Sequence, residues 1–231
     1  MKHLDKLFIG SMLGALMGGT ALPAEMKEHP ADAGATTAEV TCVPVAQRGD
    51  RELGCFVLAA RELGKLPDTA LYWHLYVYPN RTAAEAAQGA VGTVVESFGK
   101  VWLFAVTDAA WHPAGGQRVS QIGPLPIAHA GSYTAEYMAA TFLPGMKSRV
   151  HRHPGPEAWY VVSGEQCAET PERKIVLRTG EADFVPEGPP MVLWGTGTVK
   201  RQGLALILHD TSRPMSLPAP DWTPTGTCAP K

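Results

Sequence analysis

The sequence contains no run of basic residues and no strong excess of either charge, with 20 lysines and arginines against 22 aspartates and glutamates. Proteins that bind nucleic acid or anionic membranes carry basic patches, so we expect neither as a partner. None of the four cysteines stands in a Cys-x-x-Cys spacing, which argues against redox or zinc-knuckle chemistry. The chain is instead rich in turn formers, with 24 glycines and 20 prolines, as expected for a protein of many short strands.

The apolar run at residues 7–22 is short for a membrane span and contains several glycines. Lys2 and Lys6 precede it and small residues follow it, which is the layout of a secretory signal peptide. We therefore predict a signal peptide over residues 1–24 and an exported, periplasmic protein with no stable membrane span after processing. A retained membrane anchor is the alternative.

The four cysteines all lie beyond this segment, and an even number of cysteines in an exported chain suggests disulfides. Four cysteines permit three connectivities. We favour Cys42 with Cys55 and Cys167 with Cys228, because the second pair would attach the Pro-rich end of the chain to the preceding domain. Four reduced thiols are the alternative.

Residues 25–40 have few large apolar groups and no periodicity, so we predict a flexible linker there. Residues 41–130 are predicted to form an N-terminal strand and helix region, which is a small α/β module or a degenerate first barrel repeat. A strand is indicated at 71–78 by aromatic and β-branched residues, and a helix at 81–88 by helix-favouring ones. Further strands are expected at 55–60, 92–97 and 100–106, and a turn-rich connection at 111–126.

Two histidines and a glutamate stand close together after residue 145. His151 and His153 are two residues apart, so on a strand both side chains point to the same face. The Pro-Gly-Pro run at 154–156 interrupts a strand ladder, and Glu157 opens the next strand. Both imidazoles can then meet one carboxylate, which gives a 2-His-1-carboxylate metal site with open positions. Two surface histidines beside a turn are the alternative.

These residues belong to two longer patterns. The first is Gly, five residues, His-x-His, three residues, Glu, six residues, Gly, and it is matched by Gly145, His151, His153, Glu157 and Gly164. The second is Gly, five residues, Pro-x-Gly, and it is matched by Gly180, Pro186 and Gly188. Here the chain resembles the cupin superfamily, in particular proteins with a single, cupin-2-like domain. The resemblance implies an all-β, double-stranded β-helix (jelly-roll) barrel over residues 131–212, extended by the N-terminal region and by a Pro-rich tail at 213–231.

The chain departs from the family pattern at Met191, where cupins carry a fourth ligand histidine. Either the metal keeps three protein ligands, or the site has shifted towards copper, because a thioether suits Cu(I) better than harder ions. A site that no longer holds metal is a third reading. We prefer the first, since methionine is a common apolar filler of barrel interiors. The expected cofactor is one divalent transition metal, namely Fe, Mn, Zn, Ni or Cu, held by His151, His153 and Glu157.

Four residues are candidates for the wall of a substrate pocket. Alternation along the strand from Glu157 places Trp159 on the same face as the carboxylate. Met191 is a candidate because of its position in the second pattern. Tyr137 is one because it lies on the strand before the motif, and His209 because it lies on the last apolar strand. For each of them the alternative is packing in the core.

The resemblance implies a metal-dependent enzyme acting on a small organic substrate, of the dioxygenase, decarboxylase, isomerase or lyase type. A non-catalytic metal or small-ligand binding protein of the cell envelope is the alternative, and a purely structural barrel is a third. A small-molecule ligand or substrate is thus the expected partner, and the sequence is compatible with a homodimer.

The signal-peptide prediction has a direct test. We expect the mature protein to begin near residue 22 or 25, after Ala21 or Ala24, because small residues at these positions suit the processing protease. N-terminal sequencing of protein from the fractionated native host measures this. A chain that starts at Met1 and fractionates with the cytosol would contradict both the export and the compartment inferred from it.

Overall fold

The computed structural model describes residues 39–128 and 131–229. The predicted signal peptide lies outside the described residues, as does the predicted linker up to residue 38. In the described part, residues form four β-sheets, the α-helix α1 (Arg81–Ala87) and the short 3-10 helix η1 (Val45–Gln47). The predicted all-β class is confirmed. Neither helix in this part is long and apolar enough to cross a membrane.

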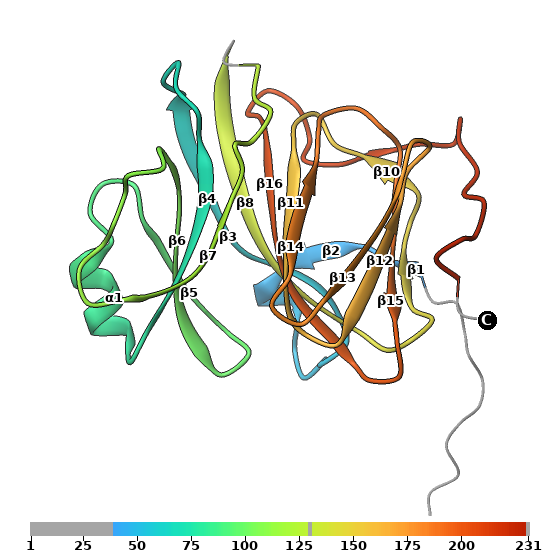
Figure 1. Ribbon diagram of the computed structural model, residues 1–231, viewed down its shortest axis with the longest axis horizontal. Coiled ribbons are helices and arrows are strands. Elements are labelled where there is room, and N and C mark those ends of the chain that lie inside the picture. The colour runs from blue at the N-terminus through green and yellow to red at the C-terminus, as the bar shows by residue number, and fades with distance from the viewer. Residues whose placement is uncertain (1–38, 129–130, 230–231) are drawn as a thin grey trace, which may run out of the picture. The chain divides into compact units, whose positions relative to one another are not determined.

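A six-stranded sheet forms the central layer (Figure 1). An uninterrupted ladder of ten residue pairs joins β16 to β8, and β3 pairs with β8 on its other side with two register shifts. All its pairings are antiparallel except that of β2 with β3. In order across the sheet the strands are β14 (Ala182–Val185), β11 (Glu157–Ser163), β16 (Arg201–Asp210), β8 (Ser132–Phe142), β3 (Gly54–Lys65) and β2 (Cys42–Pro44).

A five-stranded sheet faces one side of this central sheet (Figure 1). An apolar cluster fills the space between the two sheets, with Met138 and Trp159 from the central sheet and Leu193 and Leu177 from the other. The two sheets together form the predicted jelly-roll barrel. In order, the five strands are β1 (Glu39–Val40), β9 (Lys147–Ser148), β15 (Val192–Thr196), β12 (Glu165–Glu169) and β13 (Lys174–Arg178).

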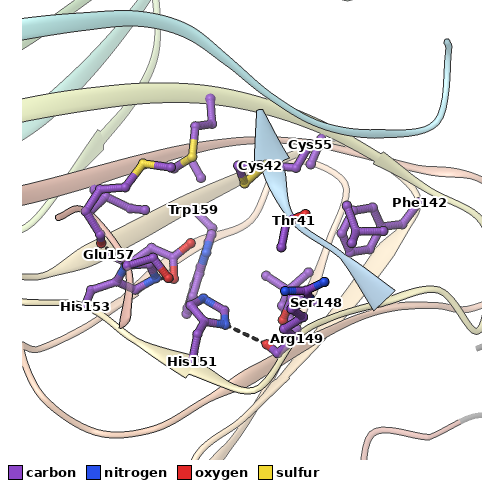
Figure 2. Close-up of a pocket in the computed structure, with 18 of the residues that line it drawn as sticks. Thr41, Cys42, Cys55, Phe142, Ser148, Arg149, His151, His153, Glu157 and Trp159 are labelled. Atoms are coloured by element: carbon purple, nitrogen blue, oxygen red, sulfur yellow. Dashed lines mark hydrogen bonds and ion pairs between the residues drawn. A yellow bond between two sulfur atoms is a disulfide. The ribbon is translucent and has the colours of Figure 1, made fainter. Parts of the chain in front are cut away.

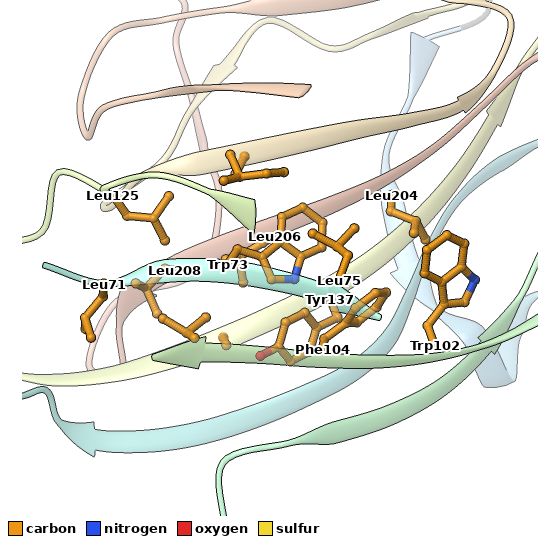
Figure 3. Close-up of a cluster of buried hydrophobic side chains, with 14 of the residues drawn as sticks. Leu71, Trp73, Leu75, Trp102, Phe104, Leu125, Tyr137, Leu204, Leu206 and Leu208 are labelled. Carbon is orange, nitrogen blue, oxygen red and sulfur yellow. The ribbon is translucent and has the colours of Figure 1, made fainter. Parts of the chain in front are cut away.

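A four-stranded antiparallel sheet covers the other face of the central sheet. A second apolar cluster joins them and includes Trp73, Trp102 and Phe104 from the outer sheet and Leu204 and Leu206 from β16 (Figure 3). The central strands β8 and β16 are rich in apolar residues because both of their faces are largely buried. In order, the outer strands are β5 (Thr93–Ser97), β6 (Lys100–Thr107), β4 (Tyr72–Tyr78) and β7 (Gln117–Ile122).

The N-terminal region differs from the prediction in its boundary. The expected helix is confirmed as α1, and Asn80 caps it by accepting a hydrogen bond from the Ala83 amide at 2.9 Å. Strands β2 and β3, however, belong to the barrel sheet, because β3 pairs with β8 from Gly54 to Lys65. The predicted division at residue 131 therefore separates strands that share one sheet. The connection predicted at 111–126 also contains a strand, β7.

The predicted linker and the predicted tail each contain a short strand. Residues 39–40, assigned to the linker, form β1 and pair with β9. The tail contains β17 (Leu217–Pro218), which pairs with β10 (His151–Arg152). Segments of two residues carry little strand signal of their own, so pairing with the barrel decides their conformation.

Both favoured disulfides are confirmed, Cys42 with Cys55 and Cys167 with Cys228. The first joins the neighbouring strands β2 and β3. The second attaches the tail to β12, where Cys167 and Cys228 pack with Val192 and Trp194 in a small apolar cluster.

The tail disulfide is expected to contribute more stability than the other. Cys167→Ala with Cys228→Ala opens a loop closed over 61 residues, which costs about 4 kcal/mol in the chain-entropy model, against about 3 kcal/mol for the 13-residue separation of Cys42 and Cys55. Urea unfolding of both double variants measures the two losses. An equal or reversed order would contradict this expectation, and peptide mapping under non-reducing conditions checks the pairing itself.

Candidate metal centre

The two histidines and the glutamate lie at a tight turn between two strands that are consecutive in the sequence. His151 lies in β10, residues 154–156 make the turn, and Glu157 begins β11. The turn packs against β16 so closely that a Cβ on Gly155 would lie 1.8 Å from the backbone oxygen of Leu208. Only glycine fits this position, and the close approach holds Glu157 next to the histidines.

The three side chains converge, as the sequence pattern predicts. One ligand atom from each of His151, His153 and Glu157 lies within 4.8 Å of the others. The two imidazole centroids are 4.7 Å apart, and Nε2 of His153 is 3.2 Å from Oε2 of Glu157. Figure 2 shows the carboxylate beside His153, with His151 facing the same space. His153 and Glu157 are buried, and His151 is half-buried.

Backbone carbonyls orient both imidazoles. Nδ1 of His151 lies 2.7 Å from the oxygen of Arg149, and Nδ1 of His153 lies 2.6 Å from the oxygen of Met215 (Figure 2 shows the first contact). A carbonyl only accepts hydrogen bonds, so each ring donates its Nδ1 proton. Each Nε2 then carries a lone pair. This is the arrangement that metal-ligating histidines usually have.

The electrostatic environment favours the forms of these groups that bind metals. Burial, with a contribution from His153, lowers the pKa of His151. Burial raises the pKa of Glu157, but the positive charge that His153 and His151 carry when protonated outweighs this effect and lowers it. Metal ligands must be deprotonated, so the lowered pKa values of His151 and Glu157 help to prepare the site.

The unpaired atoms at this site fit a cation. Among the described residues, His153 Nε2 and Glu157 Oε2 have no hydrogen-bond partner, although both are buried and close together. A lone pair facing a carboxylate is repulsive unless a positive charge lies between them. Two imidazoles and a carboxylate match the donor preferences of first-row transition metals. The side chains present therefore fit the expected metal.

Met191 lies opposite His151. The two residues exchange both backbone hydrogen bonds, at 3.1 and 2.8 Å, so their side chains project from the same face. Met191 is buried and packs in the barrel cluster with Trp159 and Ile207. The position that carries the fourth ligand in the family pattern is thus next to the site in this chain as well.

A cavity of about 350 Å³ adjoins the three side chains, between the central and five-stranded sheets. This volume is in the range of small-ligand sites. Its walls are mainly apolar (Figure 2). Besides barrel strands, two outer segments line it. One is residues 40–42, and the other is Met215, Ser216 and Pro218 from the tail.

Two of the predicted pocket residues lie on opposite faces of the central sheet. Trp159 is part of the cavity wall, as its alternation with Glu157 predicts. Tyr137 lies instead in the core beneath the outer sheet, with its ring centroid 5.2 Å from Phe104 (Figure 3). Its neighbour Met138 faces the cavity, as do Ala140 and Phe142 of the same strand. Alternation along β8 therefore corrects the placement of Tyr137 in the pocket.

His209 and Met191 are not among the residues that line this cavity. His209 lies two residues beyond Ile207 on β16, and its Nε2 is 3.8 Å from Oε1 of Glu136. Its Nδ1 also lies 2.9 Å from the backbone oxygen of Asp210. The imidazole thus pairs with a carboxylate of the adjacent strand, past the end of the cavity.

Sequence reasoning missed Arg201 and the tail residues of the cavity wall. Strand β16 begins at Arg201, three residues before the apolar run at 204–208 that indicates a strand in the sequence. Alternation back from Ile207 through Ala205 would have placed Arg201 on the cavity face once the strand was extended. No local signal indicates Met215, because its contact with His153 spans 62 residues.

The barrel topology and the convergent side chains agree with the resemblance to the cupin superfamily that the two sequence patterns indicate. No family model matches the chain, and no curated protein matches it either.

Several solved structures are similar over part of the chain. One is a cupin superfamily protein from Desulfitobacterium hafniense, 20% identical with a TM-score of 0.31, covering 33% of this chain and 68% of its own. A double-stranded β-helix protein from Klebsiella pneumoniae is 18% identical, with a TM-score of 0.33 and coverages of 37% and 75%. The DMSP lyase DddQ from Ruegeria pomeroyi is 19% identical, with a TM-score of 0.33. The match covers 37% of this chain and 43% of the lyase. Similarities this partial carry no inference about activity.

Met191→His is expected to tighten binding of zinc. Imidazole is a stronger donor than a thioether towards borderline ions, and residue 191 projects beside His151. Competition titrations with a chelator, using zinc and separately Cu(I), measure the change. Met146→His, elsewhere in the same barrel, is the control and should leave zinc affinity unchanged. Unaltered zinc affinity in Met191→His would show that residue 191 does not reach the metal, and a large loss of Cu(I) affinity would identify the thioether as a ligand.

Proposed function

We propose that this protein is a cupin-type metalloenzyme acting on a small organic substrate. The observation that carries the proposal is the pair of imidazoles, each fixed by a backbone carbonyl, that meet one buried carboxylate beside an apolar cavity. His151, His153 and Glu157 would hold one divalent transition metal. Their donor types suit Fe, Mn, Zn, Ni or Cu.

Three protein ligands leave coordination positions for a substrate. A metal so bound supplies Lewis-acid or oxygen-activating chemistry, which is the basis of the dioxygenase, decarboxylase, isomerase and lyase reactions considered above. The protein's own contribution is to bind and orient. Trp159, Ile207 and Leu193 give the cavity apolar walls, and the tail segment closes one side of it.

A non-catalytic role is the second candidate, and one observation favours it. Apart from the three candidate ligands, the titratable side chains that line the cavity are Arg149 and Arg201. Guanidinium groups stay protonated near neutral pH, so neither is a suitable general base. An envelope protein that binds a metal or a small ligand would need no such base, whereas an enzyme would have to use Glu157 or the metal for proton transfer.

We also propose that the protein works in the periplasm. Two disulfides in the described residues are consistent with an oxidising compartment, as is the predicted signal peptide. A homodimer stays a prediction from the sequence.

The double substitution of His151→Ala and His153→Ala should abolish metal binding and leave the barrel folded, because the apolar clusters stabilise the fold. Elemental analysis of protein purified from its own compartment measures the metal, and circular dichroism reports on the fold. His112→Ala, at an exposed histidine outside the site, is the control and should keep its metal. A double variant with a full equivalent of metal would refute the site. Steady turnover of any substrate by the metal-loaded protein separates the enzyme from the binding protein.

A further inference from the structure

Arg201 is a fully buried arginine at the far end of the same cavity. It is the first residue of β16, is 2% exposed and lines the cavity. Its Nη2 donates a hydrogen bond to Oε1 of Gln166, which projects from the facing five-stranded sheet. The guanidinium also lies over the ring of Phe142, with Cζ 5.7 Å from the ring centroid. These contacts fix its position but do not neutralise its charge.

The donors around Arg201 are not all paired. Among the described residues, Arg201 Nε and the Nε2 of Gln166 have no hydrogen-bond acceptor, although both residues are buried. Leaving an isolated charge and unpaired donors in a protein interior is costly. Burial lowers the pKa of Arg201 to about 10, against the opposing effect of Glu157, so the group is charged at neutral pH. An anionic acceptor in the cavity would satisfy it.

The backbone makes room for the guanidinium at Gly203. A Cβ on that residue would lie 2.2 Å from Nη2 of Arg201 and 2.8 Å from its Nε. The arginine side chain therefore lies along its own strand, over the Cα of Gly203. The next residues on this face are Ala205 and Ile207, both in the cavity wall, and Ile207 pairs with Glu157. The guanidinium and the candidate metal centre thus lie towards opposite ends of one cavity.

The space between these two ends is apolar. Gly203 and Ile207 are four residues apart on β16, which corresponds to roughly 13 Å along the strand. The side chains that line this interval offer contact surface to a hydrocarbon body, and they are Met138, Ala140, Trp159, Leu193, Ala205 and Ile207.

The charges of the cavity favour an anion. Its lining contains two guanidinium groups, Arg149 and Arg201, and one carboxylate, Glu157. The bound metal ion of the proposed function would add further positive charge. Complementary charge within a low-dielectric cavity strengthens the binding of the opposite sign.

We propose that Arg201 binds the carboxylate of the substrate, so that the substrate class is a small organic acid with an apolar body. The planar guanidinium suits a carboxylate, which it can bind through two parallel hydrogen bonds. The other end of such an acid then faces His151, His153 and Glu157. This assignment of substrate class rests on the proposed function, but the contact of Arg201 with a carboxylate can be tested apart from it.

Benzoate and its neutral counterpart benzamide are suitable probes, because they share an apolar ring and differ in charge. Calorimetric titration of the full-length mature protein should show tighter binding of benzoate. The same preference is expected in the His151→Ala, His153→Ala variant, where no metal can hold the carboxylate. A preference that disappears in this variant would place the carboxylate at the metal and overturn the proposal, while leaving the metal site itself supported.

Arg201→Met should weaken benzoate binding roughly ten- to hundredfold and leave benzamide nearly unchanged, as expected for the loss of hydrogen bonds to a charged group. Its metal content should stay at the wild-type level. Gly203→Ala keeps the charge but displaces the guanidinium, so it should also reduce the preference for benzoate. Arg201→Lys should restore part of it, since lysine retains the charge without the planar geometry.

Lys200→Met is the matched control. Lys200 is the neighbour of Arg201 in the sequence, and its side chain pairs with Glu52 at the surface, so the substitution removes one positive charge outside the cavity. It should not alter the preference. Equal binding of the two probes to the wild-type protein, or an unchanged preference in both Arg201→Met and Gly203→Ala, would overturn the proposal. If Arg201→Met does not fold, Gly203→Ala alone decides.

Discussion

The pairing of β16 with β8 is the interaction on which the rest of the molecule depends. The ten-residue register, from Arg201 opposite Phe142 to Asp210 opposite Tyr133, determines which side chains face each neighbouring sheet. One set packs against the outer four-stranded sheet, and the other faces the cavity. Because side chains alternate along a strand, a shift of one residue would exchange these sets. It would move Arg201 out of the cavity and turn the leucines of β16 towards the cavity face.

The site was largely predictable from the sequence because its members are close in the chain. His151, His153 and Glu157 fall within seven residues, and their separation by a Pro-Gly-Pro turn restricts them to one geometry. The barrel class follows from the same patterns, and both disulfide pairings were anticipated. Strands with a strong local signal, such as β4, were also found at nearly their observed boundaries.

The rest depends on contacts that the local sequence does not encode. Tyr137 stands in a strand that is apolar on both faces, so no polar alternation reveals which face meets the cavity. The membership of β3 in the barrel sheet comes from its pairing with β8, far along the chain. Likewise Met215 reaches His153 only because the tail is attached to the barrel through β17 and Cys228.

The participation of the tail bears on the order in which the protein matures. The carbonyl that orients His153 belongs to Met215, and the cysteine that fastens this segment is Cys228, near the end of the chain. The contact that orients the His153 imidazole can therefore form only after the chain has been synthesised at least as far as Met215. A chain synthesised only as far as Glu157 contains the three donor side chains but lacks the carbonyl that orients His153. The geometry of the candidate site is therefore complete only when the tail segment lies against the barrel.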